Sequence, residues 1–487
     1  MTPLSHRPHR VTKPFFTFGT LTLLMLMGIG FSFGITRLFL GLGSVTNLDN
    51  HNPWGIWIAF DVACGVALAA GGFLTALLVE ILGRRRYESL LRPALLTAFL
   101  GYLWVAIALA FDLGRYWNIW RPLFNWQGNS VLFEVGMCVT FYLIVLTIEM
   151  SPSILEGLLD RARDGSTTSR LLRRLEKPIA TLHSWVHIVL PIFIVAGVVL
   201  SCMHQSSLGT LMLIAPTKTS ALWDTSILPL LFLLSAFMVG FPMVILESIY
   251  ANISFGRKAE MELLTPLSRI IPWFIGAYAI LKFGDLFVRR HQIDFLENPA
   301  ATVALVVEIL VGVVFPFLLL QIPAVRRSMG WLFFAVALVI FGVILTRLNV
   351  FLVSYNPPYL VKAYFPSVGE IAMTIAIVSS ILFCYRLLVT FFPILPGYVP
   401  ATAEQLARLR EERERTVSPR LTWVIRISAI AVLGAFVLVY FLVHKTAVEA
   451  SERTVAEVER VIKEEPVHVS PPSVPAPLRP EAYRKVY

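Results

Sequence analysis

Long apolar stretches recur along the whole chain and are separated by short polar loops. Most are about 20 residues or longer, the length that an α-helix needs to cross the hydrocarbon core of a bilayer. They lie at about 15–40, 54–82, 92–113, 129–150, 184–203, 226–249, 269–288, 300–322, 329–348, 367–392 and 422–443. The pattern predicts an all-α integral membrane protein with ten to eleven transmembrane helices arranged in bundles.

Composition agrees with this prediction. Of the 487 residues, 56% are hydrophobic and 15% charged, and the mean hydropathy is +0.72. These values exclude a soluble domain of this length. The first stretch follows three basic residues, as a signal peptide would, but it is too long and contains Arg37, so we expect it to be retained.

The net charge of +10 does not indicate nucleic-acid binding, because its distribution follows the membrane. Most lysines and arginines fall in loops on the side of the N-terminus, so the positive-inside rule places residues 1–14 in the cytoplasm. Eleven helices would then place the C-terminal tail outside. Arg289 and Arg290 lie in a loop on the opposite side and break the pattern.

The last quarter of the chain has a different character. Residues 396–421 contain the sequence LARLREERER, which predicts a charged linker helix at the cytoplasmic surface. The eleventh span follows at 422–443, and a proline-rich extended tail occupies 444–487. The tail either binds an extramembrane subunit or remains free.

The four cysteines are isolated within predicted spans, and no pair has CxxC spacing. The sequence therefore predicts no iron–sulfur cluster or zinc site of the chain's own.

Ionisable side chains within or near the predicted spans are the strongest indication of function. They are Asp61, Glu80, Asp112, Arg115, Glu134, Glu149, His187, His204, Glu247, Lys282, Asp285, Glu308, Arg347, Glu370 and Arg386. A charged group without a partner is costly in hydrocarbon, so such residues mark a functional site by default. Structural ion pairs, such as Asp112 with Arg115, are the alternative.

These groups fall into two sets by their predicted depth in the membrane. Those near the outer ends of the second to fifth helices are Asp61, Asp112, Arg115, Glu134 and His204, together with Tyr116. Glu80, Glu149 and Glu247 fall toward the cytoplasmic side. This arrangement predicts a site near the outer face with a proton route that runs inward. Nearby tryptophans, including Trp57, suit either an interfacial belt or the walls of a site for a flat ring.

The histidines argue against haem. A bis-histidine haem needs imidazoles that face each other across helices. The histidines in or beside the spans are His183, His187, His204 and His444. The first three share one predicted helix, so we expect no haem.

Four segments carry a family resemblance: PWGIWIAFD, DLGRYWN with the following NSVLFE, MHQSSLGTLML, and FMVGFPMVILES. They resemble the HybB-type membrane subunit of nickel–iron hydrogenases, within the wider NrfD/polysulfide-reductase family. The resemblance is strong over residues 35–250 and weaker to about 395. It makes residues 15–395 an NrfD-like quinone-binding domain, whereas the eleventh helix and the tail lie outside the pattern.

The resemblance implies a haem-free subunit of the bacterial cytoplasmic membrane. It would exchange electrons between membrane quinone, menaquinone or ubiquinone, and a partner iron–sulfur subunit. The further partners would be nickel–iron hydrogenase subunits or another catalytic subunit, as in sulfur-compound reductases or alternative complex III. The matched motifs make Arg115, Tyr116, Glu134 and His204 quinone-site residues and place Glu247 on a proton path.

Residue chemistry is consistent with these roles. Reduction of a quinone consumes two electrons and two protons, so a donor such as His204 or Tyr116 needs a titratable neighbour. Glu134 in a low-dielectric site would carry protons near neutral pH. We expect Asp61, Asp112 and Trp57 to complete the site. Two other classes remain open, a secondary transporter with a site near the bilayer midplane and a structural anchor.

Overall fold

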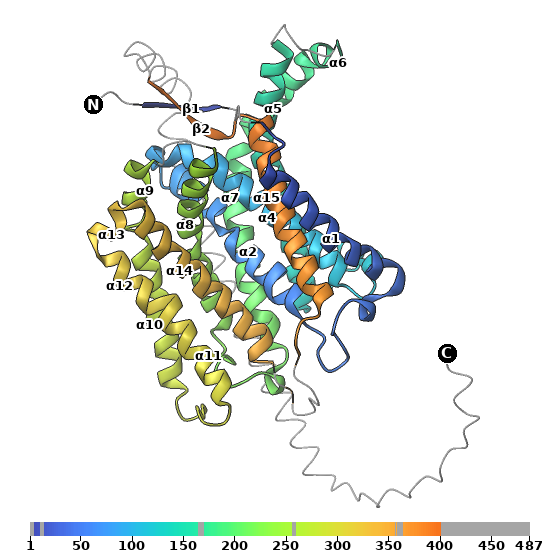
Figure 1. Cartoon of the computed structure of the whole chain (residues 1–487), viewed down its shortest axis with the longest axis vertical. Helices are drawn as coiled ribbons and strands as arrows, with labels where there is room; N and C mark the ends of the chain where they lie inside the picture. The colour runs from blue at the N-terminus through green and yellow to red at the C-terminus, as the bar shows by residue number, and fades with distance from the viewer. Residues whose placement is uncertain are drawn as a thin grey trace, which may run out of the picture. The chain divides into compact units, whose positions relative to one another are not determined.

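The computed structural model describes residues 4–9, 14–163, 170–255, 260–355, 357 and 364–400 (Figure 1). Within these residues, ten helices are long and apolar enough to cross a membrane. The predicted all-α membrane fold is therefore confirmed. The eleventh span predicted at 422–443 and the tail at 444–487 lie outside the described residues.

The membrane-crossing helices follow one another with short connections. They are Phe18–Leu40 (α1), Trp57–Ile81 (which includes α2, Gly65–Leu68, and α3, Ala70–Ala76), Arg85–Asp112 (α4 from Glu88), Val131–Arg163 (α5), Glu176–Leu213 (α7), Leu228–Phe255 (α8), Met261–Val288 (α9, Met261–Leu267, and α10, Ile271–Val288), Pro299–Gln321 (α11, Pro299–Ile309, and α12, Phe315–Gln321), Met329–Val353 (α14 to Leu348) and Val368–Phe391 (α15). The shorter elements are α6 (Arg170–Arg174), α13 (Pro323–Arg327), β1 (Leu4–His9) and β2 (Leu395–Pro400).

Successive helices run in opposite directions, so their connecting loops lie at two opposite ends of the bundle. Loops 41–56, 113–130, 214–227 and 289–298, together with residues 354–355 and 364–367, share one end, which we call the outer end after the sequence prediction. The opposite end, called the inner end, carries α6, α13 and the strands. There β1 and β2 pair antiparallel, with Leu4 opposite Pro400 and His9 opposite Leu395.

The helix Trp57–Ile81 is the most buried of the ten and lies at the centre of the bundle. Small residues allow this close packing, as is common between membrane helices. A Cβ atom added to Gly72 would lie 2.4 Å from the Cβ of Ala98 on α4, and one added to Gly71 would lie 3.1 Å from the carbonyl oxygen of Gly240 on α8. Both ends of this central helix are π-helical, over Trp57–Cys64 and Leu77–Ile81.

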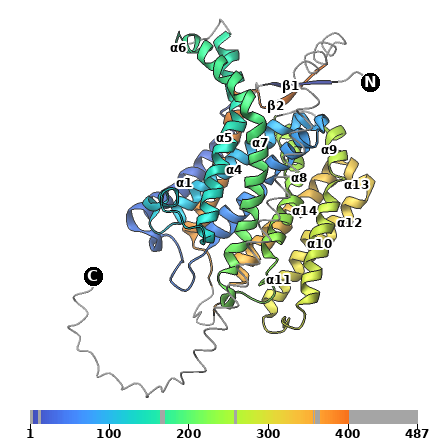
Figure 2. The ribbon, with the colours of Figure 1, turned by 180° about the vertical axis from the view of Figure 1, so that it is seen from behind.

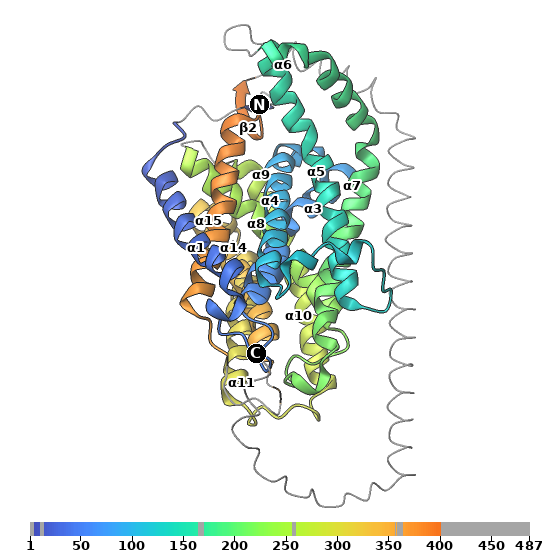
Figure 3. The same cartoon turned by 90° about the vertical axis from the view of Figure 1, so that its right-hand side faces the viewer.

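The other helices form groups around this central helix. α1 lies along α15 at one edge, and α10 to α14 lie at the opposite edge (Figure 1). The view from behind shows α5 and α7 running together across the bundle (Figure 2). α6 joins their inner ends (Figure 3).

Several boundaries differ from the sequence prediction. α5 continues to Arg163 and α7 begins at Glu176, although apolar character predicted an end near 150 and a start near 184. Residues that favour helices but not hydrocarbon extend both elements. α7 also runs to Leu213, well past the predicted end at 203. Residues 396–400, the first part of the predicted linker helix, lie in β2, and the rest of that linker lies outside the described residues.

Candidate functional site

One group of buried polar side chains lies at the outer end between α1, the central helix, α4 and α15. We call Arg37, Asp61, Asp112, Glu370 and Thr374 the Asp61 cluster. Asp61 is 5% exposed, and its Oδ2 accepts a hydrogen bond of 2.9 Å from the Thr374 hydroxyl. Asp112, at the end of α4, lies within electrostatic range of Asp61, Arg37 and Glu370. Helices far apart in the sequence therefore bring three carboxylates and one guanidinium together.

Arg37 connects this cluster to the loop after α4. It is 1% exposed, and its Nε donates to the carbonyl oxygen of Phe111 at 2.6 Å. A second nitrogen donates to the carbonyl oxygen of Leu113. The guanidinium also lies over the ring of Tyr116, 5.0 Å from its centroid. Arg37 thus caps α4 and positions Tyr116 at the border of the cluster.

Glu370 anchors the first outer loop to α15. Its Oε2 accepts from the backbone nitrogens of Asn47 and Ser367, at 3.0 and 2.9 Å, and the Tyr364 hydroxyl donates to its Oε1 at 2.5 Å. Trp57 donates from Nε1 to the backbone oxygen of Glu370 at 3.1 Å. Burial, and then the bond to Glu370, raise the pKa of the loop residue Tyr364, so the phenol keeps its proton and remains a donor.

Gly55 is required where this network meets the backbone. A Cβ atom added to Gly55 would lie 2.5 Å from the Tyr364 hydroxyl and 2.8 Å from Oε1 of Glu370. The glycine of the sequence PWGIWIAFD therefore allows the chain to enter the central helix beside these two polar groups.

A second group, buried except for Glu134, lies between α4, α5 and α7, and we call Tyr102, Glu134, Tyr142, His204 and Ser207 the His204 cluster. His204 is fully buried, and its ring lies 5.6 Å from that of Tyr102, which meets the Tyr142 ring edge-on at 4.5 Å. The Ser207 hydroxyl donates to Oε1 of Glu134. One face of α7 therefore links a buried imidazole to a carboxylate in the first turn of α5.

Six atoms of the two clusters are buried without a hydrogen-bond partner among the described residues. They are Oδ1 of Asp61, Oδ1 of Asp112, the hydroxyls of Tyr102 and Tyr142, and both ring nitrogens of His204. The backbone of Val135 lies beside the His204 imidazole. Buried polar atoms in proteins almost always have a partner, either protein, water or ligand. Both clusters therefore offer unused donors or acceptors toward the outer end.

The structure separates residues that the sequence predicted to form one group. Trp57, Asp61, Asp112 and Tyr116 belong to the side of α1 and α15, whereas Glu134 and His204 belong to the side of α5 and α7. Arg115 is exposed in the loop after α4.

Two of these positions correct the sequence analysis. His204 was expected at the end of its helix, but α7 continues for nine residues beyond it, because the polar run HQSS is helical and buried. Glu134 was expected in a low-dielectric enclosure, whereas its side chain is exposed at the start of α5.

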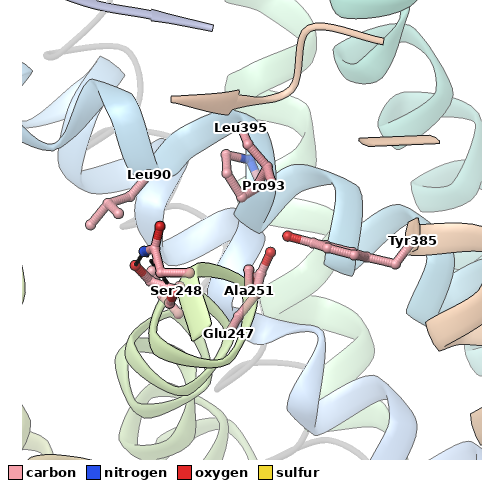
Figure 4. Close-up of a pocket in the computed structure, with 9 residues that line it drawn as sticks. Leu90, Pro93, Glu247, Ser248, Ala251, Tyr385 and Leu395 are labelled. Atoms are coloured by element: carbon pink, nitrogen blue, oxygen red, sulfur yellow. Dashed lines mark hydrogen bonds between the residues drawn. The ribbon is translucent and has the colours of Figure 1, made fainter. Parts of the chain in front are cut away.

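Glu247 lies apart from both clusters, in the inner half of α8. It lines a pocket together with Ser248, Asn252, Tyr385 and Leu395, and Figure 4 shows Tyr385 and Glu247 at its lower border, below Pro93. Oε1 of Glu247 makes no hydrogen bond among the described residues, although the hydroxyls of Tyr385 and Thr97 lie beside the carboxyl group. The predicted inner position of this acid is thus matched by a pocket at the same depth.

A third buried polar group joins α8, α10, α11 and α14. Lys282 and Glu308 are 4% and 1% exposed, with 3.8 Å between Nζ and Oε1. Arg347 is fully buried over the ring of Phe232, 3.5 Å from its centroid, and donates to Ser235 at 2.9 Å. These groups were noticed in the sequence, but their pairing depends on contacts between distant helices.

Several members of these clusters could not be assigned a site role from the sequence. Arg37 and Glu370 were noted only as charges in or near spans, whereas Ser207, Thr374 and Tyr102 carry no distinguishing pattern. Ser207 could have been found from its place in MHQSS. It follows His204 by three residues and precedes Leu211 by four, so all three lie on one face of a helix.

In this helical membrane protein, buried acids, a histidine and arginines gather in clusters at one end. Such clusters are typical of subunits that move charge within a membrane. Residues 44–357 match the family model described as "Polysulphide reductase, NrfD". The chain belongs to this family, as its motifs predicted.

Curated relatives match most of the chain. A protein of Nitratidesulfovibrio vulgaris is 37% identical over 80% of this chain and 98% of its own length. The "Probable Ni/Fe-hydrogenase 2 b-type cytochrome subunit" of Escherichia coli is 34% identical over 81% of this chain and 96% of its own. The "Menaquinone reductase, integral membrane subunit" of N. vulgaris is 27% identical, over 73% and 86%.

Proposed function

We propose that this chain is the quinone-reactive membrane subunit of a respiratory redox complex in the bacterial cytoplasmic membrane. It exchanges electrons between a partner iron–sulfur subunit and menaquinone or ubiquinone, with coupled proton transfer. The family supports this role, and so do two relatives, one named as a hydrogenase subunit and one as a menaquinone reductase subunit. The proposed catalytic partners are the large and small subunits of a nickel–iron hydrogenase.

The same role in a sulfur-compound reductase or an alternative complex III is the second candidate, and the family's description as polysulphide reductase favours it. In either complex the N-terminus faces the cytoplasm, in accordance with the basic loops of the inner end.

The observation that carries the proposal is the set of unpartnered buried atoms at the outer end. A quinone presents two carbonyl oxygens, which accept hydrogen bonds, and a quinol presents two hydroxyls, which donate them. His204 can donate from one ring nitrogen and accept at the other, and Asp61 and Asp112 each keep an acceptor oxygen. We assign Trp57, Arg115 and Tyr116 to the surroundings of the ring and Glu134 to proton delivery.

The proton chemistry follows from the bond between Ser207 and Glu134. Each electron pair delivered to a quinone must be matched by two protons that reach its oxygens. His204 gives one proton to a quinone oxygen, and Glu134 replaces it through the Ser207 hydroxyl, one helical turn along α7. After Glu134 has been reprotonated, a second round of the same transfer supplies the second proton. When quinol is oxidised, the same groups run in reverse.

The variant His204→Ala tests this assignment in the intact complex. We expect quinone-coupled turnover to fall by about 10²-fold or more, the usual contribution of a positioned acid or base. Turnover of an artificial dye by the catalytic partner should not change. His291→Ala, which removes an exposed histidine from another outer loop, is the matched control. Equal loss of both activities would favour the structural-anchor alternative.

We propose that protons enter from the inner end at the Glu247 pocket. Buried groups continue toward the outer end between α4, α5 and α7, namely Glu149, which is 6% exposed, then Tyr142, Tyr102 and His204. Glu149 and Glu134 are fifteen residues apart on α5, which corresponds to about 22 Å along the helix. Waters are needed to complete such a route.

Glu247→Gln should slow quinone reduction or uncouple it from the membrane potential, because an amide cannot carry a proton. Glu262→Gln, at an exposed position of the same end, is the control. Wild-type rates with unchanged proton uptake in vesicles that contain Glu247→Gln would contradict the route.

We also propose that the chain binds no haem, although one relative is named a b-type cytochrome subunit. The ring contact of His204 is with Tyr102, and His183 and His187 share one helix. A stoichiometric b-type spectrum, reduced minus oxidised, from the subunit expressed alone would refute this.

A further inference from the structure

Three metal-binding side chains converge where α5 and α7 extend beyond the bundle. They are Glu156 on α5 and His183 and His187 on α7, and one ligand atom from each lies within 4.8 Å of the other two. The two histidine Nε2 atoms are 3.1 Å apart, and Nε2 of His183 lies 3.8 Å from Oε1 of Glu156. None of these residues belongs to the two clusters described above.

This spacing is close to that of a coordinated ion. Zinc binds imidazole nitrogen and carboxylate oxygen at about 2.0–2.2 Å in tetrahedral geometry, so two of its ligand atoms are about 3.3 Å apart. The nitrogen pair already has nearly this separation, and a small rotation of Glu156 would bring its oxygen to the same distance. Histidines four residues apart on a helix are well suited to one ion, because both rings project from the same face.

Arg92 orients the carboxylate toward the two helices. Its two terminal nitrogens donate to the two oxygens of Glu156 at 2.6 and 3.0 Å. Metal-binding carboxylates in proteins are usually held by hydrogen bonds of this kind. The guanidinium also places a positive charge beside the site. Because this charge repels a cation, we expect a divalent ion to bind reversibly.

The site is within reach of water. α5 and α7 have 33 and 38 residues, and about 20 residues suffice to cross the hydrocarbon core. Counted from their outer ends at Val131 and Leu213, both helices have left the core before they reach Glu156 and His187. His187 is exposed, and Trp185 beside it is 64% exposed, as expected of an interfacial residue.

We propose that Glu156, His183 and His187 form a binding site for a divalent transition metal, with Zn²⁺ as the preferred ion, that joins α5 to α7. The three side chains leave a fourth tetrahedral position for water. Both histidines must be without a proton on the binding nitrogen, so binding releases protons and weakens at acidic pH. The absence of paired cysteines argued against a zinc site, but that argument concerned thiolate ligands alone.

The test is a calorimetric titration of the full-length purified subunit with Zn²⁺, on protein that carries a tag without histidine and has been treated with a chelator. We expect one strong site per chain, lost in His187→Ala and weakened by more than about tenfold in Glu156→Gln. His291→Ala, an exposed histidine of the other end, and a double alanine variant of His6 and His9 on β1 should bind as wild type does.

Thermal unfolding separates loss of the site from loss of the fold. Wild type and His187→Ala should unfold at the same temperature without metal, and only wild type should become more stable with Zn²⁺, since an ion that binds the folded state alone stabilises it. X-ray absorption should show imidazole among the ligands. An isotherm unchanged by His187→Ala, the absence of strong binding in wild type, or a spectrum without imidazole would overturn the proposal.

Discussion

The buried pair of Lys282 and Glu308 allows a quantitative test of whether a charge inside this bundle serves structure or transport. Oε2 of Glu308 accepts from Nε1 of Trp223 at 3.1 Å and from the side-chain amide of Asn349 at 2.8 Å. The lysine lies 3.8 Å from the other oxygen. Lys282→Met keeps most of the length of the side chain and removes its ammonium group.

The expected loss follows from the burial of both groups. Removing one partner of a buried ion pair costs about 3–5 kcal/mol, because the remaining charge has no compensation. The hydrogen bonds from Trp223 and Asn349 to Glu308 remain, so we expect a value near the lower end, about 3 kcal/mol. The double variant Lys282→Met/Glu308→Gln removes both charges of the pair and keeps an acceptor for both donors. It should recover most of the loss.

The assay is unfolding in detergent, followed by tryptophan fluorescence, for wild type, both single variants and the double variant. Trp223, one of the eleven tryptophans that contribute to this signal, is 1% exposed beside the pair. Equal stability of Lys282→Met and wild type would refute the assigned pairing, and so would a double variant as unstable as the single one. If the double variant keeps quinone-coupled turnover, the pair is structural.

Three further predictions concern packing, the outer loop and the tail. Gly342→Ala should destabilise the bundle by about 1–3 kcal/mol, because the new Cβ would lie 2.1 Å from a backbone atom of the facing helix, whereas Gly330→Ala has open space; equal unfolding of the two would contradict the close helix contact. Tyr364→Phe removes the hydroxyl that donates to Glu370 and accepts from the backbone nitrogen of residue 56, so limited proteolysis of the outer loop in detergent should become faster, and an unchanged rate would count against this anchor. Truncation after Lys445 should weaken co-purification of an extramembrane partner without affecting membrane insertion, provided the tail lies outside and binds that partner; undiminished co-purification, or protease access from the cytoplasmic face alone, would show otherwise.

The helices could be predicted because hydrocarbon imposes a length and a composition on each of them. The exceptions are places where polar residues remain helical, as at His204 and Gln205, where the side chains face other helices rather than lipid. Gln205 is fully buried and donates to the backbone oxygen of Val66 at 2.9 Å. Hydropathy records the polarity of such a residue but not the partner that makes it tolerable.

The composition of the clusters could be predicted only in part, for a related reason. Depth along a helix can be estimated from sequence, so Asp61, Asp112 and Glu134 lie near the end where they were expected, whereas His204 lies nine residues before the end of α7. Depth does not indicate which helices face each other. The residues that were predicted to form one site therefore lie in two clusters. The pairing of Asp61 with Thr374 spans 313 residues of sequence, and a threonine in an apolar helix gives no indication of its partner.

The two clusters differ in how much of each lies within the region that matches the family model. Residues 44–357 include every membrane-crossing helix described except α1 and α15. The His204 cluster and Glu247 lie wholly within this range. The Asp61 cluster does not, because Arg37 comes from α1, and Glu370 and Thr374 come from α15.

The matched region therefore carries the proposed proton-transfer groups by itself, whereas the two flanking helices complete the surroundings of its outer acids. Without α1 and α15, Asp61 would lose the Thr374 hydroxyl and Asp112 would lose its neighbouring guanidinium. α1 packs along α15, so these two helices together form the side of the bundle that borders the acids. Changes in these two helices should alter the environment of Asp61 and Asp112 and leave the His204 cluster intact.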